Sequence, residues 1–262
     1  MAADSRGRAL SRRQFVQSAG IGVALALGLT HPAGAQERIS YGSGPAQVAD
    51  LYAGPAGAPV LVWVTGGGWI LFDFGIARPF ASALQAANIT VVVPSYTLGA
   101  PEAATRDLVQ AVALAEGLPG RGRLTLGGHS AGAHLAALVA LRNRASVDRL
   151  LLLSGVYDLP GTVRDGGLAA QLVRQAFGAD PAVWMTYSPL SYVRADAPPT
   201  WVVQGAQDFD ASAARAADFA TRLREAGAPV RWSLLPGVGH LDTPQGLLAQ
   251  RDAVVEFLRG PE

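Results

Sequence analysis

The sequence contains no cysteine and no lysine, and all 21 of its basic residues are arginine. The missing cysteines exclude a thiol nucleophile, a disulfide framework, an iron–sulfur cluster and any thiolate zinc site. The missing lysines exclude Schiff-base chemistry, Ser–Lys catalysis and the lysine of a phosphate-binding loop. Any chemistry must therefore use Ser, His, Asp, Glu, Tyr or Arg side chains.

Charge is also scarce. Charged residues make up 16% of the 262 residues, whereas hydrophobic residues make up 50%. This composition argues against global disorder, and the length suits a single α/β domain. The formal net charge is +1, and beyond residue 35 no segment concentrates arginine. We therefore expect no nucleic-acid partner, since a nucleic-acid groove needs a dense basic surface.

Residues 1–35 have the pattern of an export signal. Four arginines precede an apolar run at 21–29, and residues 32–35 form a small-residue cleavage pattern. Residues 11–17 resemble the twin-arginine signal. The apolar run is shorter than the roughly 20 residues that cross a bilayer. We expect cleavage after Ala35, the twin-arginine export machinery as a partner, a periplasmic or secreted location, and no stable membrane insertion of the mature chain. An uncleaved amphipathic anchor is the alternative.

Beyond the signal, apolar runs alternate with alanine-rich segments. The expected strands are 60–64, 89–93, 123–126, 150–153, 201–203 and 231–235. The expected helices are 76–87, 103–116, 131–144, 211–226 and 244–259. Residues 38–52 are expected to form an antiparallel hairpin. The alternation predicts an α/β fold in one domain, 36–262, with a mainly parallel sheet and helices on both faces. Residues 157–192 break the rhythm, which predicts a small cap over the carboxyl edge of the sheet.

One motif predicts a nucleophile. Residues 128–132, Gly-His-Ser-Ala-Gly, match G-x-S-x-G between an expected strand and an expected helix. A sharp strand-to-helix turn presents the central side chain outward, and the helix N-terminus favours developing negative charge. Ser130 is therefore the predicted nucleophile, with an ordinary helix cap as the alternative.

A serine nucleophile needs a base, and the sequence has only four histidines. His31 lies in the export segment. His129 adjoins Ser130 and is expected to point away from the site, and His134 is expected to fill a helix-packing position. His240 follows the last expected strand directly, so we predict that it is the base, with a loop-capping histidine as the alternative.

The base in turn needs a carboxylate that orients it. Asp208 follows the expected strand 201–203, which makes it the first candidate. Asp210, two residues further on, and Asp158, after the strand 150–153, remain alternatives. The structural interpretation of Asp158 is a cap or turn residue.

A glycine-rich loop completes the pattern. Residues 65–69, Thr-Gly-Gly-Gly-Trp, follow the strand 60–64, and glycines let backbone N–H groups face a substrate oxygen. Ala131 N–H is a second expected donor. A phosphate loop is excluded because Leu71 stands where its last glycine belongs and no lysine exists. A purely structural glycine turn is the alternative. Trp69, Phe72 and Phe74 are expected to wall an apolar substrate pocket, with core packing as the alternative.

Together, these motifs resemble the alpha/beta-hydrolase superfamily over residues 39–262. The similarity is greatest to the small esterase and formamidase-like branch related to hormone-sensitive-lipase-type carboxylesterases. Segments 41–52, 96–102 and 188–190 are similar to segments of that branch. The resemblance implies a catalytic triad and an oxyanion hole, made by Ser130, Asp208 and His240 and by Gly67, Gly68 and Ala131. One departure is Thr65, where that branch usually has a histidine that helps to hold the oxyanion loop.

The expected activity is hydrolysis of a small carboxylic ester through an acyl-enzyme, with no metal or organic cofactor. The small-molecule ester is the expected substrate partner. Two alternatives stay open. One is an amidase or arylformamidase with the same triad. The other is a non-catalytic binding protein on a hydrolase scaffold, which the Thr65 departure supports.

Overall fold

The computed structural model describes residues 36–260. The expected export signal and its cleavage site therefore lie outside the described residues. Within them, the chain forms an eight-stranded sheet in the order β1-β2-β4-β3-β5-β6-β7-β8. The strands are β1 (Gln36–Ser40), β2 (Val48–Tyr52), β3 (Val60–Val64), β4 (Thr90–Pro94), β5 (Leu124–His129), β6 (Arg149–Leu153), β7 (Thr200–Gly205) and β8 (Val230–Leu235).

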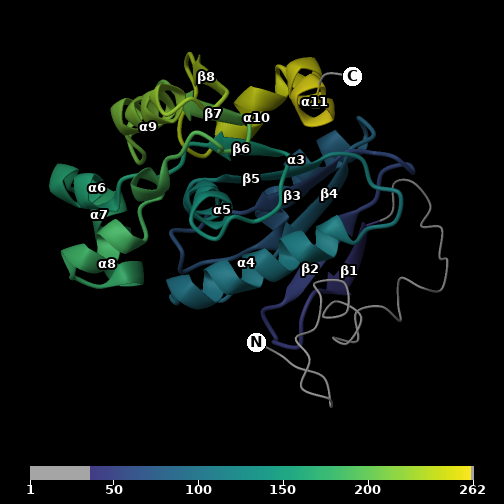
Figure 1. Ribbon diagram of the computed structural model, residues 1–262, viewed down its shortest axis with the longest axis horizontal. Coiled ribbons are helices and arrows are strands. Elements are labelled where there is room, and N and C mark those ends of the chain that lie inside the picture. Colours follow the sequence, from purple (N-terminus) through teal and green to yellow (C-terminus); the bar gives the residue numbers. More distant parts are fainter. Residues whose placement is uncertain (1–35, 261–262) are drawn as a thin grey trace.

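The sheet is parallel from β4 to β8, and β1 and β2 form an antiparallel hairpin at its edge. Figure 1 shows this sheet as the centre of the molecule. The helices are α3 (Phe74–Gln85), α4 (Pro101–Glu116), α5 (Ala131–Leu141), α6 (Leu159–Asp165), α7 (Gly167–Phe177), α8 (Pro181–Thr186), the 3-10 helix η1 (Pro189–Tyr192), α9 (Ala213–Glu225), α10 (Thr243–Leu248) and α11 (Arg251–Arg259).

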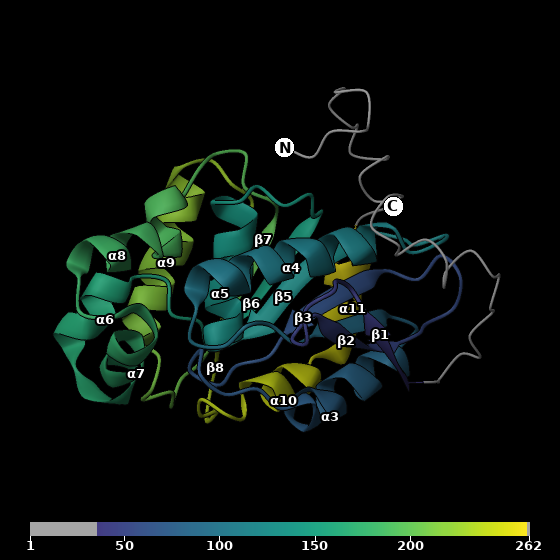
Figure 2. The same cartoon turned by 90° about the horizontal axis from the view of Figure 1, so that it is seen from below.

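Helices cover both faces of the sheet. Helices α4, α5 and α9 lie on one face, and α3, α10 and α11 lie on the other (Figure 2). Strand β3, at the centre of the sheet, is apolar at every position because both of its faces are buried. In β3, Val62 packs in the core under α4 and α5, whereas Leu61 packs under α3 and α10, since successive side chains of a strand point to opposite faces. The predicted fold class is thus confirmed.

The expected elements lie where the sequence placed them, with one exception. The segment 244–259 is two helices, α10 and α11, and not one. Gln250 leaves the helical region, with φ −107° and ψ 36°, and its N–H ends α10 on the carbonyl of Leu247. No glycine or proline stands at the break. The break lets α10 pack against α3 and β7 while α11 takes its own direction.

Helices α6, α7 and α8 and η1 occupy the interval between β6 and β7. Both views place α6, α7 and α8 together at the end of the molecule far from β1 (Figures 1 and 2). Arg215, in the first turn of α9, bonds Asp158 and Asp165 at the two ends of α6. The role of 157–192 as a cap stays a prediction. Within residues 36–260, no helix is long and apolar enough to span a membrane.

Candidate active site

Ser130 stands at a strained turn between β5 and α5. Its backbone has φ 56° and ψ −125°, which is rare for a residue with a side chain. The flanking glycines allow this turn, because a Cβ on Gly132 would lie 2.0 Å from the carbonyl oxygen of Val64. A Cβ on Gly128 would lie 2.6 Å from the backbone of Gly132. The spacing of G-x-S-x-G is therefore fixed by close backbone approach, and the turn presents the Ser130 hydroxyl at the sheet edge.

His240 bonds Ser130 on one side and Asp208 on the other. Its Nε2 lies 2.9 Å from Ser130 Oγ, and its Nδ1 lies 2.8 Å from Asp208 Oδ2. These three residues come from the turns after β5, β7 and β8, whose carboxyl ends meet at one edge of the sheet. An ionised Asp208 accepts Nδ1–H, which leaves Nε2 free to accept the Ser130 proton. The structure thus brings together the three residues predicted from separate parts of the sequence.

Asp208 is held by four hydrogen bonds. Oδ2 accepts from His240 and from Gln204 Nε2 at 2.7 Å, and Oδ1 accepts from the N–H groups of Asp210 and Ala211 at 3.0 and 2.8 Å. Its side chain is fully buried. Burial alone would raise the pKa of this carboxyl, but the bonds from His240 and Ala211 outweigh it and lower the pKa below its ordinary value. Asp208 is therefore a carboxylate at neutral pH.

The two alternative carboxylates do not reach His240. Asp210 is exposed, and only its backbone N–H contributes, to Asp208. Asp158 is the N-cap of α6, where it accepts from Gly161 N–H at 3.0 Å and pairs with Arg215 at 2.7 Å. Asp158 thus has the structural role that was the alternative interpretation of it.

The glycine loop follows β3 and passes close to the turn at Ser130. Gly67 and Gly68 have φ of 126° and 59°, and a Cβ on Gly66 would lie 3.0 Å from the Cβ of Ser130. Within residues 36–260, no hydrogen bond engages the N–H groups of Gly67, Gly68 or Ala131. These donors stay available for a substrate oxygen, as an oxyanion hole requires.

Other residues take the place of the missing loop histidine. The Tyr96 hydroxyl donates to the Thr65 carbonyl at 3.2 Å, and Gly99 N–H donates to the Trp69 carbonyl at 2.9 Å. Trp69 Nε1 donates to His134 Nδ1 at 3.0 Å. Thr65 itself is buried, and its hydroxyl has no partner in the described structure. The glycine loop is thus anchored at both ends without the side chain at position 65.

The aromatic residues after the glycines lie mainly in the core. Trp69 is buried between His134 and Phe177, with edge-to-face ring contacts to both. This placement corresponds to the packing alternative and not to a pocket wall. Phe72 is partly buried and makes edge-to-face contacts with Phe74 and Tyr96. Neither Trp69 nor Phe72 lines the cavity described below.

His129 and His134 are both buried but differ in their partners. His134 accepts from Trp69 and donates from Nε2 to the Tyr187 carbonyl at 2.7 Å, so it packs the helix as predicted. His129 donates from Nε2 to the His240 carbonyl at 2.9 Å. The expectation that His129 points away from the site is therefore wrong. Burial lowers the pKa of each to about 4, so both are neutral at neutral pH.

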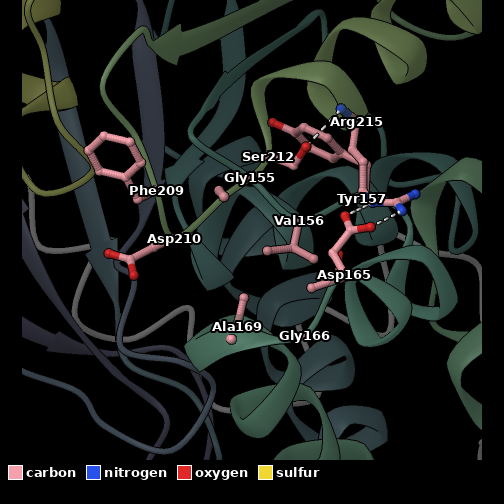
Figure 3. Close-up of a pocket in the computed structure, with 13 residues that line it drawn as sticks. Gly155, Val156, Tyr157, Asp165, Gly166, Ala169, Phe209, Asp210, Ser212 and Arg215 are labelled. Atoms are coloured by element: carbon pink, nitrogen blue, oxygen red, sulfur yellow. Dashed lines mark hydrogen bonds and ion pairs between the residues drawn. The ribbon is translucent and has the colours of Figure 1, made fainter.

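A cavity of about 230 Å³ adjoins the site. It lies between the residues after β6, the turn from α6 to α7, and the residues that follow Asp208. Figure 3 shows Phe209 on one side and Tyr157, Asp165 and Arg215 on the other, with Val156 between them. Among the described residues, no cluster of three or more His, Asp or Glu side chains is placed to hold a metal ion.

Sequence reasoning missed the groups that support the predicted residues. Gln204 donates to Asp208, and the Ser154 hydroxyl bonds the Thr243 hydroxyl at 2.8 Å, which donates in turn to the Gly239 carbonyl. One signal was present for Gln204. Gln204 directly continues the apolar strand 201–203, so its amide needs a buried hydrogen-bond partner. Asp208 lies four residues further on.

The parallel sheet, the strained serine turn and the His-linked carboxylate define a hydrolase architecture, and the comparison with known families agrees. The family model described as alpha/beta hydrolase fold matches residues 61–242. The chain belongs to this family.

Three known proteins illustrate what the chain is similar to. Esterase LipQ of Mycobacterium tuberculosis is 28% identical and aligns with 88% of this chain but only 65% of its own length. Kynurenine formamidase of Drosophila melanogaster is 25% identical over 86% of this chain and 81% of its own. The solved structure of a hyperthermophilic esterase from Pyrobaculum calidifontis has a TM-score of 0.72 and 24% identity, with 94% and 90% of the two chains covered. The chain thus spans less than two thirds of the mycobacterial relative.

Proposed function

We propose that this protein is a serine hydrolase that cleaves small carboxylic esters through an acyl-enzyme. The observation that carries the proposal is the position of His240, with Ser130 Oγ 2.9 Å from one ring nitrogen and Asp208 2.8 Å from the other. This arrangement is the one that transfers a proton from a serine and steadies the resulting imidazolium. The similarity to an esterase over most of the chain supports the same reaction.

The mechanism follows from the arrangement. The ester carbonyl lies between Ser130 and the glycine loop. Ser130 attacks the carbonyl carbon while His240 Nε2 takes the hydroxyl proton, and Asp208 holds Nδ1–H. The N–H groups of Gly67, Gly68 and Ala131 take up the negative charge of the tetrahedral oxygen. His240 then gives its proton to the leaving alcohol, and an acyl-enzyme remains on Ser130.

Water completes the cycle. His240 removes a proton from the water molecule as it attacks the acyl carbon, and the glycine-loop donors again hold the oxygen. When the intermediate collapses, His240 returns the proton to Ser130 Oγ and the carboxylic acid leaves.

The test is hydrolysis of p-nitrophenyl acetate, butyrate and octanoate by the wild type and by Ser130→Ala. The wild type should turn over the short chains, and the variant should lose at least about a thousandfold in kcat. A wild type as slow as the variant, with no labelling by a serine-reactive phosphonate, would point instead to the non-catalytic binding scaffold.

Amide hydrolysis is the second candidate, because the similarity to a formamidase covers most of both chains. The same triad can attack a formanilide, with His240 protonating the leaving amine. A matched pair, phenyl formate and formanilide, separates the two activities. The ester proposal expects the ratio of kcat/KM for phenyl formate to kcat/KM for formanilide to exceed the ratio of their uncatalysed rates.

The location belongs to the same proposal. The basic, apolar and small-residue pattern of residues 1–35 supports export by a twin-arginine route to the periplasm or the medium. The test is processing of the full chain and of the variant with Arg12→Lys and Arg13→Lys. The wild type should appear outside the cytoplasm with Gln36 at its N-terminus, and the variant should stay inside and unprocessed. Equal export of both would overturn the route.

A further inference from the structure

The base of the proposed site sits on a segment without regular structure. Residues 236–242 join β8 to α10 through turns, so the position of His240 depends on individual bonds. Gln207 N–H donates to the Val238 carbonyl at 2.9 Å, and the Thr243 hydroxyl donates to the Gly239 carbonyl at 3.0 Å. These two bonds hold the chain before His240.

The carbonyl of His240 itself is held by His129. The His129 Nε2–H group donates to this carbonyl at 2.9 Å, and the two imidazole rings lie 4.9 Å apart. His129 is the last residue of β5 and directly precedes Ser130. Two consecutive residues therefore bond His240: His129 bonds its backbone carbonyl, and Ser130 bonds its ring.

His129 also adjoins the glycine loop. A Cβ on Gly66 would lie 3.3 Å from His129 Nδ1 and 3.0 Å from the Cβ of Ser130. The imidazole thus lies between the glycine loop and the segment that carries the base. His129 is itself held in place, because β5 pairs with β3 on one side and β6 on the other. Its ring can therefore fix the positions of both the glycine loop and the segment 236–242.

We propose that His129 is a positioning residue for the hydrolytic reaction, which holds the main chain of His240 so that its ring stays in line with Ser130. The inference rests on the proposed function. Because His129 makes no hydrogen bond to Gly67, Gly68 or Ala131 within residues 36–260, its loss should lower kcat and leave KM nearly unchanged. Burial keeps the ring neutral, so it retains one donor nitrogen for the carbonyl.

The test compares two substitutions at one position. His129→Leu keeps an apolar volume but has no donor, whereas His129→Gln carries an amide N–H at about the reach of Nε2. We expect kcat of His129→Leu to fall about 10- to 100-fold, since the His240 carbonyl then keeps only the long bond from Thr243 N–H at 3.4 Å. The glutamine variant should recover to within about fivefold of the wild type. The kcat values are taken per site titrated with a phosphonate, so loss of folded protein does not enter.

His134→Leu is the matched comparison. It removes an equally buried histidine with two hydrogen bonds, neither of which goes to His240. It should lower the melting temperature, and any loss of kcat should act through Trp69 and the glycine loop, with the bond between His240 and Asp208 unchanged. If His129→Leu lowers only the melting temperature, or if His129→Gln restores no kcat, the positioning role is overturned.

A second measurement does not depend on turnover. The proton on His240 Nδ1, bonded to Asp208, is observable in the NMR spectrum of histidine-labelled protein. We expect this resonance to be sharp in the wild type and in the glutamine variant, and broadened in the leucine variant. If the wild type hydrolyses no ester, the proposed function fails, yet this spectrum still decides whether His129 fixes His240. An unchanged resonance in the leucine variant would contradict the inference.

Discussion

Two groups of residues flank Ser130 and use their hydrogen-bonding groups in opposite ways. Asp208 and His240 form the acid side, and the glycine loop, residues 65–69, forms the glycine side. On the acid side, Asp208 accepts four hydrogen bonds and His240 is bonded at both ring nitrogens and at its carbonyl. On the glycine side, the N–H groups of Gly67 and Gly68 bond nothing within the described residues. The acid side is complete without a substrate, whereas the glycine side presents donors that no group of the described residues satisfies. Substitutions can alter each side separately, and we expect the two sides to differ in how much kcat they lose.

The largest expected effect is on the acid side. Asp208→Asn keeps the shape but favours the wrong histidine tautomer, so kcat should fall about ten-thousandfold. The measurement is steady-state hydrolysis of p-nitrophenyl acetate. Asp210→Asn is the control and should keep the wild-type kcat, because the Asp210 side chain bonds nothing in the site. A loss below about tenfold for Asp208→Asn would mean that the carboxylate does not serve His240.

The glycine side should respond to a single methyl group. A Cβ on Gly67 would lie 2.2 Å from the carbonyl oxygen of Leu71, and φ of 126° is strained for alanine. Gly67→Ala should therefore displace the donors and lower kcat about 10²- to 10³-fold.

The control for Gly67→Ala is Gly57→Ala. Gly57 also has a positive φ, 81°, but a Cβ there would meet no atom within 4 Å. This substitution should cost about 1 kcal/mol of stability and leave kcat unchanged. Equal losses of kcat in both variants would show that backbone strain, and not the donors, determines the effect.

Acid should lower the free energy of unfolding through His134, whose Nδ1 accepts a hydrogen bond from Trp69 at the end of the glycine loop. The folded protein keeps His134 neutral to about pH 4, whereas the unfolded chain binds this proton below about pH 6.5. The unfolded state then binds more protons, so the free energy of unfolding falls as the pH falls from 6.5 to 4. From pH 7 to pH 5, the wild type should lose about 2 kcal/mol more than His134→Gln. Urea unfolding at the two pH values measures this, and equal losses would contradict it.

The smallest expected effect concerns one donor on the acid side. Gln204→Met keeps the length of the side chain but removes the Nε2 bond to Asp208. The carboxylate keeps three of its four partners, so kcat should fall about tenfold. KM for p-nitrophenyl acetate should stay the same, because Gln204 lies behind Asp208. A kcat equal to the wild type would show that the other three bonds suffice.

The same contrast explains what the sequence could and could not predict. Ser130, Asp208 and His240 were predictable because each follows an apolar strand, and the ends of parallel strands meet at one edge. The glycine loop was predictable for the same reason. Ser154, Thr243 and the bond from His129 were not, because a partner 89 or 111 residues away leaves no trace in local spacing. The break at Gln250 was also hidden, since tertiary packing and not a helix-breaking residue sets it.

Arg215 links the segment after β6 to the body of the fold. Its guanidinium bonds Asp158, before α6, at 2.7 Å, and Asp165, at the end of α6, at 2.5 and 2.7 Å. Arg215 thus joins both ends of α6 to α9. Beyond Asp165, the insert makes no further ion pair with Arg215 within the described residues. For protein engineering, this defines the boundary of an exchangeable module. A graft that replaces residues 167–186 keeps α6 and its ion pairs with Arg215. A graft that begins before Asp158 also removes both carboxylates that join α6 to α9.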